Sequence, residues 1–320
     1  MKKMKLSTKS NTQASYGASE LARILHDRLE VGPTLHRLRQ AQVWIVLAIA
    51  SIVLMWGGMK LGGRFGLLVG FLLALSFNAL IYFYDQWRLT PRFDGPEFEG
   101  QDPWGCLAIT HRLVERLRQN SPFPMPILRK FDCETPMVLA SGLTSRNLRL
   151  FISTGALKRL SPEELEAAIA FQLIRFHTNQ LRLATAAAAF ADMMLTLAAA
   201  LDAGFFLRFF LGREPRRNCP GPVTWCFRPF VIMFLRLVMH RKSFSAVDQL
   251  TAETFGCTQT LARTLVKLDA YNKTLPANVN YAEASLCIVD PLAGLPESSW
   301  ASIQPPIESR VKALVGHFPL

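Results

Sequence analysis

Two uncharged apolar runs lie close together near the start of the chain, at Val43–Met59 and Phe65–Tyr84. Each has about the 17–25 residues that an α-helix needs to cross the hydrocarbon core of a bilayer. The turn between them is short and contains two basic residues and two glycines, Lys60, Gly62, Gly63 and Arg64. The pattern therefore predicts a membrane-spanning helical hairpin over residues 43–84.

The charges around this hairpin predict its orientation. Residues 1–42 carry eight Lys or Arg residues and the turn carries two, so the positive-inside rule places the N-terminus in the cytoplasm. After two crossings the chain returns to the cytoplasm near Asp85. The net charge of +12 is explained by basic juxtamembrane segments that meet anionic lipid. No interleaved basic and aromatic motif points to nucleic acid, so the expected partner is the lipid bilayer.

A second pair of apolar runs, Leu183–Leu211 and Val223–Met239, contains charged residues. Charged groups within a bilayer are costly and usually face protein or one another. If the runs fold as an antiparallel hairpin, Asp202 falls between the levels of Arg228 and Arg236, which favours an ion pair. The linker contains three arginines, which opposes full spanning under the positive-inside rule. The sequence leaves open whether this hairpin at about residues 183–239 spans the bilayer or lies at its interface.

The rest of the chain has the alternation of a mixed α and β domain. Helical periodicity covers residues 103–120 and returns from Pro162, from about Ser243 and over residues 258–272. Short strands are predicted at Ile127–Phe131, Met137–Ala140 and Leu148–Ser153. Residues 274–303 are predicted to be loop and the first 18 residues to be disordered. The fold class is therefore mainly α with a small β-sheet (α+β), with two to four transmembrane helices.

The helix that begins after Ser161 has a strong start signal and an unusual buried face. Ser161 is a good N-cap, Pro162 suits the first helical position, and Glu164 completes a capping box. Further along the helix, Phe171 and Arg175 are four residues apart and share one face, next to Gln172.

Several segments in this order resemble the HtpX-type membrane zinc metalloproteases, which are relatives of the CAAX prenyl endopeptidases. Ala170-Phe171-Gln172-Leu173-Ile174-Arg175 stands where that family has A-H-E-x-x-H. Phe244-Ser245-Ala246-Val247-Asp248 stands where it has E-x-x-x-D, and Gln304–Arg310 resembles its H-P-P-x-x-x-R segment. The resemblance covers roughly residues 40–315. It implies a zincin-like cytoplasmic domain and a bacterial inner-membrane location.

The resemblance also implies that the reacting groups of such a protease are replaced. The family binds zinc with two histidines and a glutamate, and a further glutamate is the general base. Phe171 and Phe244 have no lone pair for a metal, the cation of Arg175 repels one, and Gln172 is no base near neutral pH. We therefore expect no catalytic residue, no metal and no cofactor. An Arg175–Asp248 ion pair beside a Phe171–Phe244 contact is predicted to replace the metal site.

No other set of residues suggests a metal site. No two of the six histidines are three or four residues apart, and the six cysteines form no C-x-x-C pair. Scattered cysteines of this kind fit a protein that faces a reducing cytoplasm.

The family resemblance also predicts where a peptide would bind. In these proteases an extended substrate lies along an edge strand before the active-site helix, and here that strand is Met137-Val138-Leu139-Ala140. An edge strand can accept a peptide through backbone hydrogen bonds without any catalytic group. The family usually has N-A-F-A at this place, so the side chains next to a bound peptide differ between this chain and the family.

Three functions are consistent with the sequence. The favoured hypothesis is a non-catalytic pseudoprotease that binds a membrane or peptide partner, with a role in protein quality control. The alternatives are an active metalloendopeptidase or other hydrolase with relocated catalytic groups, and a membrane interaction protein unrelated to proteases. The expected division is a basic cytoplasmic segment (1–42), a transmembrane hairpin (43–84) and a metalloprotease-like domain (85–320) interrupted by the second hairpin.

Overall fold

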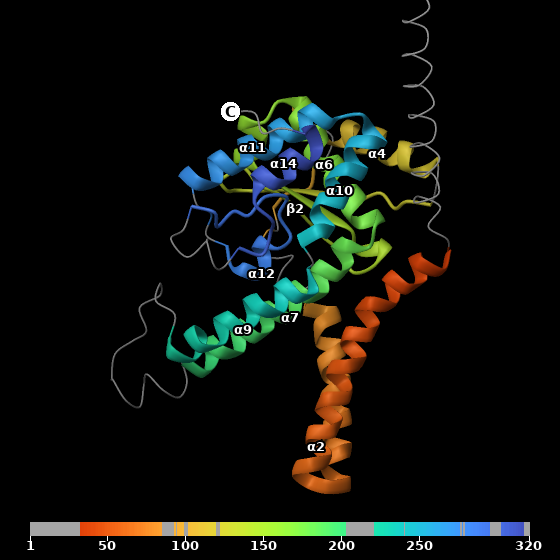
Figure 1. Cartoon of the computed structure of the whole chain (residues 1–320), viewed down its shortest axis with the longest axis vertical. Helices are drawn as coiled ribbons and strands as arrows, with labels where there is room; N and C mark the ends of the chain where they lie inside the picture. The colour runs from red at the N-terminus through yellow and green to blue at the C-terminus, as the bar shows by residue number, and fades with distance from the viewer. Residues whose placement is uncertain are drawn as a thin grey trace, which may run out of the picture. The chain divides into compact units, whose positions relative to one another are not determined.

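The protein is described by a computed structural model, shown in Figure 1. The structure describes residues 33–84, 93, 95–98, 102–119, 122–202, 221–239, 241–275, 277, 279–294 and 302–316. The predicted disorder of the first 18 residues lies outside these ranges, as does most of the basic segment. The chain divides into two compact units, Met1–Ala48 and Ile49–Leu320, and every site discussed below lies in the second.

The first two apolar runs form helix α2, Pro33–Tyr84, which is interrupted at Gly62 and Gly63. Gly63 has φ of 57°, in the left-handed region that glycine adopts without steric cost. The chain turns back at these two glycines. As a result, Gly58 and Gly66, one from each arm, approach each other closely through their backbones. A Cβ placed on Gly58 would lie 2.2 Å from the carbonyl oxygen of Gly66. The two arms therefore form a closely packed helical hairpin.

Most of the described side chains of α2 are apolar and exposed, as expected of helices that face lipid. They include Ile52, Val53, Trp56, Phe65, Leu68, Phe71 and Leu75. By length and composition, the segment Ser51–Ser76 of α2 and helix α7, Gln180–Leu201, could each cross a membrane. A third span results if Pro222–Val238 and Ser243–Phe255, which are bent by 46°, count as one.

The β-sheet has three strands in the order β1-β3-β2. β1 (Ile127–Phe131) pairs in parallel with β3 (Arg149–Ser153), and β2 (Val138–Ser141) pairs antiparallel with β3. The short 3-10 helix η2 (Ser145–Asn147) links β2 to β3. The predicted strands agree with the observed ones to within one residue at each end, because turn residues bound each of them.

The predicted fold class of a mainly α protein with a small β-sheet is confirmed, and helix α6 (Pro162–His177) is its centre. It packs against β2, α4, α7, α10 and α11. Every residue of α6 from Ala167 to Phe176 is buried. The remaining helices are α4 (Cys106–Arg118), α5 (Thr154–Arg159), α9 (Pro222–Val238), α10 (Arg241–Phe255), α11 (Thr258–Thr274), α12 (Tyr281–Ala284) and α14 (Ile307–Val315).

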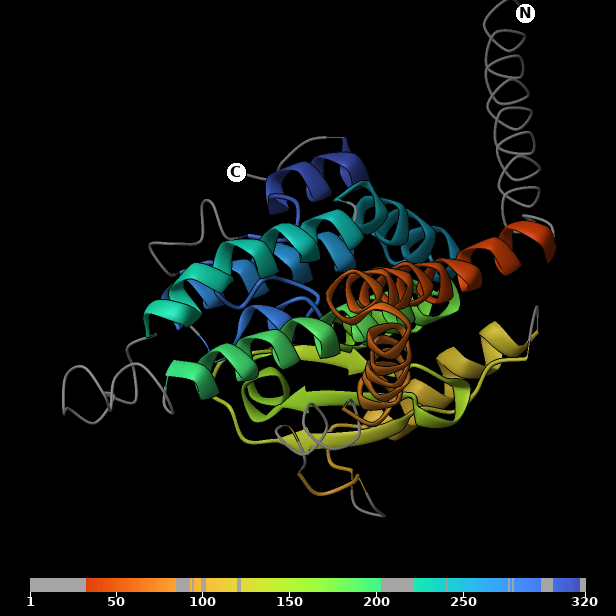
Figure 2. The same cartoon turned by 90° about the horizontal axis from the view of Figure 1, so that it is seen from below.

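Helices α7 and α9 lie side by side in both views and form the second apolar hairpin (Figures 1 and 2). The predicted ion pair of Asp202 with Arg228 or Arg236 is wrong. The Asp202 carboxylate instead accepts the backbone N–H groups of Val223 and Thr224, at 2.9 and 2.8 Å. A carboxylate is stabilised at a helix N-terminus because the first N–H groups have no partner within the helix. Asp202 therefore caps α9 and closes the hairpin.

The arginines of α9 reach residues outside the hairpin. The guanidinium of Arg236 donates to the carbonyl of Ser302, and that of Arg228 lies 5.0 Å from the ring centroid of Tyr281. On α7, Asp192 accepts a hydrogen bond from the Asn280 amide. The charges inside the apolar runs thus attach the hairpin to α12 and to the segment before α14.

The close approach of Gly58 and Gly66 predicts the effect of adding one methyl group. Gly58→Ala places a carbon against the opposite backbone, and overpacking of this kind costs about 1–3 kcal/mol. Gly57→Ala is the matched control, since no atom lies within 4 Å of a Cβ there. We expect thermal unfolding in detergent micelles at a lower midpoint for Gly58→Ala only. Equal midpoints for the two variants would argue against the packed hairpin.

Candidate functional site

Helix α6, which carries Phe171, Gln172 and Arg175, begins as its sequence predicts. The Ser161 hydroxyl accepts from the backbone N–H of Glu164, and the Glu164 carboxylate accepts from the backbone N–H of Ser161. Glu164 also bonds Lys267 of α11 at 2.6 Å. The start of α6 is therefore fixed both locally and against a neighbouring helix, which sets the direction of every side chain further along.

The predicted site residues converge at the junction of three helices. Phe171, Gln172 and Arg175 project from α6, and Phe244 and Asp248 project from α10. All five are buried. Arg310, from α14, lies in the same cluster and has no exposed surface. The sequence predicts no contact for it and indicates only that it ends the segment similar to H-P-P-x-x-x-R.

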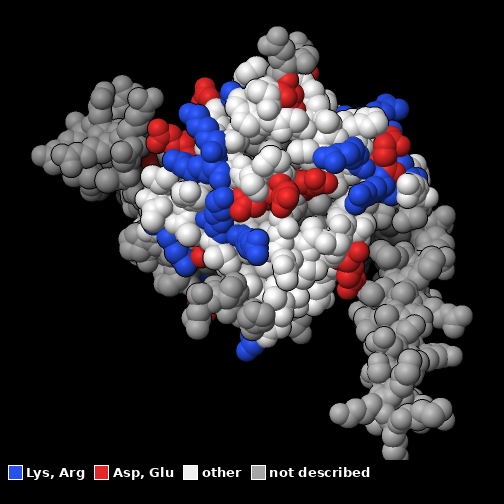
Figure 3. Space-filling model, turned by 90° about the horizontal axis from the view of Figure 1, so that it is seen from above, with Lys and Arg blue, Asp and Glu red and all other residues white. Residues whose placement is uncertain are grey.

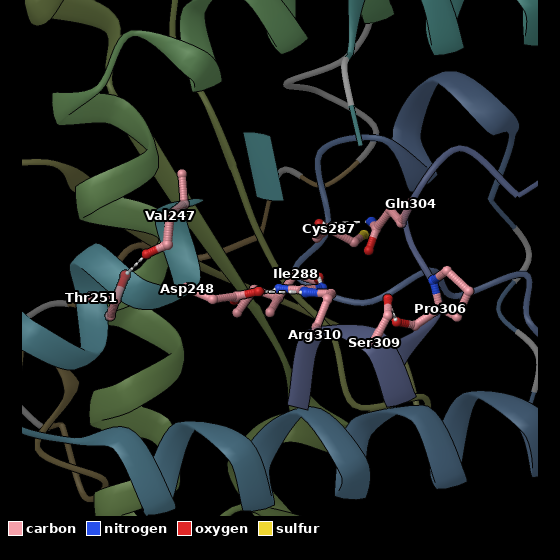
Figure 4. Close-up of polar contacts among 9 residues, drawn as sticks. All are labelled: Val247, Asp248, Thr251, Cys287, Ile288, Gln304, Pro306, Ser309 and Arg310. Atoms are coloured by element: carbon pink, nitrogen blue, oxygen red, sulfur yellow. Dashed lines mark hydrogen bonds and ion pairs between the residues drawn. The ribbon is translucent and has the colours of Figure 1, made fainter. Parts of the chain in front are cut away.

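The carboxylate of Asp248 pairs with Arg310 and not with Arg175, so the predicted ion pair is wrong. Arg310 Nε and Nη2 each lie 2.8 Å from one oxygen of Asp248, in the parallel fork that guanidinium and carboxylate favour (Figure 4). The third nitrogen, Nη1, donates to the carbonyl of Ile288 at 2.7 Å. Both charged groups are fully withdrawn from water, with 0% and 1% of their side-chain surfaces exposed.

The two phenylalanines lie against this cation. The Arg310 Cζ is 5.2 Å from the ring centroid of Phe171 and 5.6 Å from that of Phe244. The sequence predicts a direct contact between the two rings, whereas the structure places a guanidinium against both. A cation near the face of an aromatic ring is stabilised by the ring quadrupole, by about 2 kcal/mol where water is excluded.

Arg175 binds backbone carbonyl groups in place of a carboxylate. Its Nη2 donates to Ser285 O at 2.7 Å, and its Nη1 donates to Leu286 O at 3.1 Å and Cys287 O at 3.4 Å. Its Cζ also lies 4.9 Å from the centroid of the Phe244 ring. Burial and the nearby Arg310 cation lower the pKa of Arg175 to about 9, so Arg175 is still a cation at neutral pH.

Two glutamines complete the polar part of the cluster. Gln172 Nε2 donates to Val138 O on β2 and to Leu286 O, both at 3.1 Å. Gln304 Nε2, at the histidine position of the resembled terminal motif, donates to Cys287 O at 3.1 Å and Ala284 O at 3.3 Å. The Oε1 atoms of both glutamines are buried without a hydrogen-bond partner.

These residues do not fit a zinc ion. A zinc site in a protease needs three protein ligands, usually imidazole or carboxylate groups. Here the positions hold two hydrocarbon rings and a cation, and the neighbouring Asp248 has both oxygens committed to Arg310. The spare oxygens of Gln172 and Gln304 are neutral and poor ligands for zinc. Within the described part of the chain, no three His, Cys, Asp or Glu residues could hold a metal together.

The predicted peptide-binding strand, Met137–Ala140, is buried and already paired on its outer edge. Leu139 forms an antiparallel bridge with Cys287, and Ile288 N donates to Val138 O at 3.4 Å. Cys287 and Ile288, which fall in a stretch predicted to be loop, thus pair with β2 directly after the turn that ends α12. The run Leu286-Cys287-Ile288-Val289 was the signal for this burial, because four consecutive apolar residues are unusual in an exposed loop.

The described part of the chain combines apolar helical hairpins with a mainly helical domain around the buried pair of Arg310 and Asp248. No family model matches the chain. A Protease HtpX homolog from Pelotomaculum thermopropionicum is 28% identical over 283 residues, which cover 87% of this chain and 98% of the relative. The relative of the same name from Gemmatimonas aurantiaca is 28% identical over 284 residues, with 87% and 98% covered.

A third Protease HtpX homolog, from Persephonella marina, is 25% identical and covers 84% of this chain and 94% of its own length. The predicted resemblance to the HtpX-type proteases is therefore confirmed over nearly the whole length of these relatives. Among solved structures, the crystal structure of S. mikatae Ste24p covers 87% of this chain and 64% of its own chain, at 17% identity and a TM-score of 0.44.

The buried ion pair predicts a large loss of stability when one partner is removed. Asp248→Asn leaves the Arg310 cation without a counter-charge, which costs about 3–5 kcal/mol at buried sites. Glu115→Gln removes the partner of Arg118 in an exposed pair and should cost less than about 1 kcal/mol. Chemical denaturation of the two variants gives the free energies of unfolding. A small loss for Asp248→Asn would show that Arg310 is stabilised by other contacts.

Proposed function

We propose that this protein is a non-catalytic homologue of the HtpX-type proteases, a pseudoprotease that acts by binding a membrane protein or an extended peptide. The observation that carries the proposal is the Arg310 guanidinium, which lies against Phe171 and Phe244 at the place where the family has zinc ligands. A cation held there by Asp248 opposes the entry of a metal dication.

The chemistry of the neighbouring groups supports the same proposal. Hydrolysis in the family depends on a carboxylate that takes a proton from a metal-bound water. Gln172 occupies that position, and its amide nitrogen is engaged by two backbone carbonyls. An amide does not accept a proton near neutral pH. The four replaced positions thus remove the groups for metal binding and for proton transfer together.

The partners that we propose are the bilayer and a protein or peptide at its surface. Exposed apolar side chains on α2 and on α9, where they include Trp225, Phe230 and Met233, favour contact with lipid. On the face shown in Figure 3, Lys and Arg side chains are interspersed with Asp and Glu. Nucleic-acid binding needs a basic surface of one sign, so this face offers no support for it.

We further propose that the main domain faces the cytoplasm of a bacterial cell and is anchored in the inner membrane. The excess of Lys and Arg before the α2 hairpin, eight residues against two in its turn, supports this orientation. A role in membrane protein quality control is consistent with the names of the relatives, which are proteases. The partner would be recognised by a surface that the proteases use for substrates.

The proposal predicts that the purified protein contains no stoichiometric zinc and does not cleave casein. Metal analysis and a casein assay in detergent micelles test both points. Arg175→Ala shows whether any zinc that is found depends on this cluster, because Arg175 is buried within it. One zinc per chain in the unaltered protein, lost on Arg175→Ala, would contradict the proposal.

Rebuilding the family pattern tests the same residues in the opposite direction. The combined variant Phe171→His, Gln172→Glu, Arg175→His and Phe244→Glu restores three metal ligands and the base. We expect it to bind more zinc than the unaltered protein. Cleavage of casein is not expected, since groups that orient metal ligands are themselves needed for activity and here Asp248 is held by Arg310.

The topology can be tested with reporter fusions. If both ends of the α2 hairpin are cytoplasmic, fusions after Gln42 and after Gln101 should both give cytoplasmic signals. A variant in which the Lys and Arg residues before Gln42 are changed to Gln serves as the comparison, because it leaves Lys60 and Arg64 of the turn as the main basic residues next to the membrane and should favour the inverted orientation. A periplasmic signal at Gln101 in the unaltered protein would overturn the orientation.

A further inference from the structure

The two ends of the α7–α9 hairpin lie on the same side of any membrane that it meets. Helix α6 leads into α7, α10 follows α9, and α6 packs directly against α10. The hairpin therefore crosses a membrane twice or not at all. By length and composition α7 could cross, so the contacts that the two helices make with the domain around α6 distinguish the two cases.

Most of α7 is enclosed by that domain. Every residue from Ala184 to Ala189 is buried, and Asp192 accepts a hydrogen bond from Asn280, which caps α12. Beyond Asp192, the stretch from Met193 to Leu201 rises only about 14 Å, at about 1.5 Å per residue. The hydrocarbon core of a bilayer is about 30 Å thick. The part of α7 that is free of the domain therefore covers less than half of it.

Helix α9 lies along the domain over most of its length. Arg228, in its first half, lies over the ring of Tyr281, and Arg236, near its end, donates to the carbonyl of Ser302. The buried residues between these arginines are Val231, Ile232 and Leu235. The bent continuation into α10 adds no span, because α10 carries the buried Asp248 and packs against α6.

The opposite face of α9 is apolar and exposed over the same stretch. Phe230, Met233 and Leu237 are 65%, 64% and 81% exposed, and spacings of three and four residues put them on one side of the helix. Every exposed residue of α9 is uncharged, and so are the exposed leucines near the end of α7, Leu197 and Leu201. A continuous exposed apolar face of this kind marks a contact with a membrane or a protein.

We infer that the α7–α9 hairpin does not cross the membrane and that α9 lies in the plane of one membrane surface, between the domain and the acyl chains. The inference rests on the proposed bilayer partner, to which it adds the depth and the direction of the contact. Helices that lie in this way bury their apolar face about 5–10 Å into the boundary between headgroups and acyl chains. Phe230, Met233 and Leu237 are the residues that enter it.

The charges of the segment agree with this arrangement. The linker between the two helices contains four arginines, Arg208, Arg213, Arg216 and Arg217. A crossing hairpin would carry them to the side away from the domain, whereas a hairpin that stays on one side keeps them with the domain, as the positive-inside rule requires. Both arginines of α9 contact the domain, so the face toward lipid carries no charge.

The number of crossings can be tested by finding the side from which the linker is labelled. Bacterial spheroplasts that contain the full-length protein are treated with a membrane-impermeant maleimide, before and after they are opened. Cys219 is the probe in the linker, and Cys219→Ser is its control. Glu115→Cys is the probe on the domain, because the Glu115 side chain is 51% exposed. All variants carry Cys226→Ser, which removes the exposed cysteine of α9.

We expect the label on Cys219 and the label on Glu115→Cys to require access from the same side of the membrane. Labelling of the two positions from opposite sides would overturn the inference, and so would labelling of Cys219 from neither side, which would place the linker inside the bilayer. The comparison is made between two positions of one protein, so it holds whichever way the chain is oriented.

The depth of α9 is tested in vesicles of phosphatidylcholine and phosphatidylglycerol. A fluorophore is attached in turn to Phe230→Cys, Met233→Cys and Leu237→Cys, and nitroxide quenchers are placed near the headgroup or near the end of the acyl chain. A helix in the membrane plane has all three positions at one shallow depth, so the shallow quencher should act at least about twofold more strongly at each of them. The fluorophore on Glu115→Cys should be quenched by neither.

A crossing helix gives a different pattern, because Phe230 and Leu237 then differ in depth by about 10 Å, at about 1.5 Å per residue. A ratio of shallow to deep quenching that changes along α9 would overturn the inference. So would a lack of quenching at all three positions, since a protein, such as a second copy of the chain, would then cover the face. The proposed pseudoprotease function is contradicted by zinc content and casein cleavage, which neither experiment measures.

Discussion

The ion pair of Asp248 with Arg310 determines how the rest of the site is arranged. A buried carboxylate is tolerable only when it is paired and fully hydrogen-bonded, and the fork of Arg310 uses both of its oxygens. With Asp248 taken, the second buried cation, Arg175, must find other acceptors. It finds them in the carbonyls of residues 285–287, which draws that segment against α6 and β2.

The aromatic rings follow from the same pair. Phe171 and Phe244 cover the guanidinium of Arg310 from α6 and α10, and Phe244 also lies near Arg175. Large apolar rings exclude water, which strengthens every charge interaction between them. The cluster therefore depends on rings and charges together. The same ion pair attaches α14 to α10, and its two residues are 62 positions apart in the sequence.

Much of this architecture could be predicted from local signals. The turn residues that bound each strand gave the three strands, and the Ser161–Glu164 capping box gave the start of α6. The spacing of Phe171 and Arg175 placed both on one helix face. The partner of Arg175 could not be predicted, because Asp248 has a single carboxylate and two arginines, Arg175 and Arg310, lie close to it. Which of them binds it depends on the position of α14, and no local pattern near Arg175 encodes that position.

The charged residues of the second hairpin also have partners that spacing along the sequence does not predict. Asp202 could be matched by level to the arginines of α9, yet its carboxylate meets the N-terminus of that helix. Asp192 and Arg236 bond residues of α12 and of the segment before α14. Spacing along a hairpin predicts neighbours within it, while partners from other elements come from tertiary structure. The bridge between Leu139 and Cys287 was missed for this reason, as it joins residues about 150 positions apart.

The guanidinium groups that join α6, α10 and α14 are synthesised with the chain, whereas a metal ion must be captured after synthesis. Where a metal holds helices together, its binding free energy is part of the folding free energy, and its supply governs which molecules are complete. A joint made of Arg310, Asp248 and two rings needs no such loading step. It forms in each copy as the copy folds, because every group in it is part of the chain.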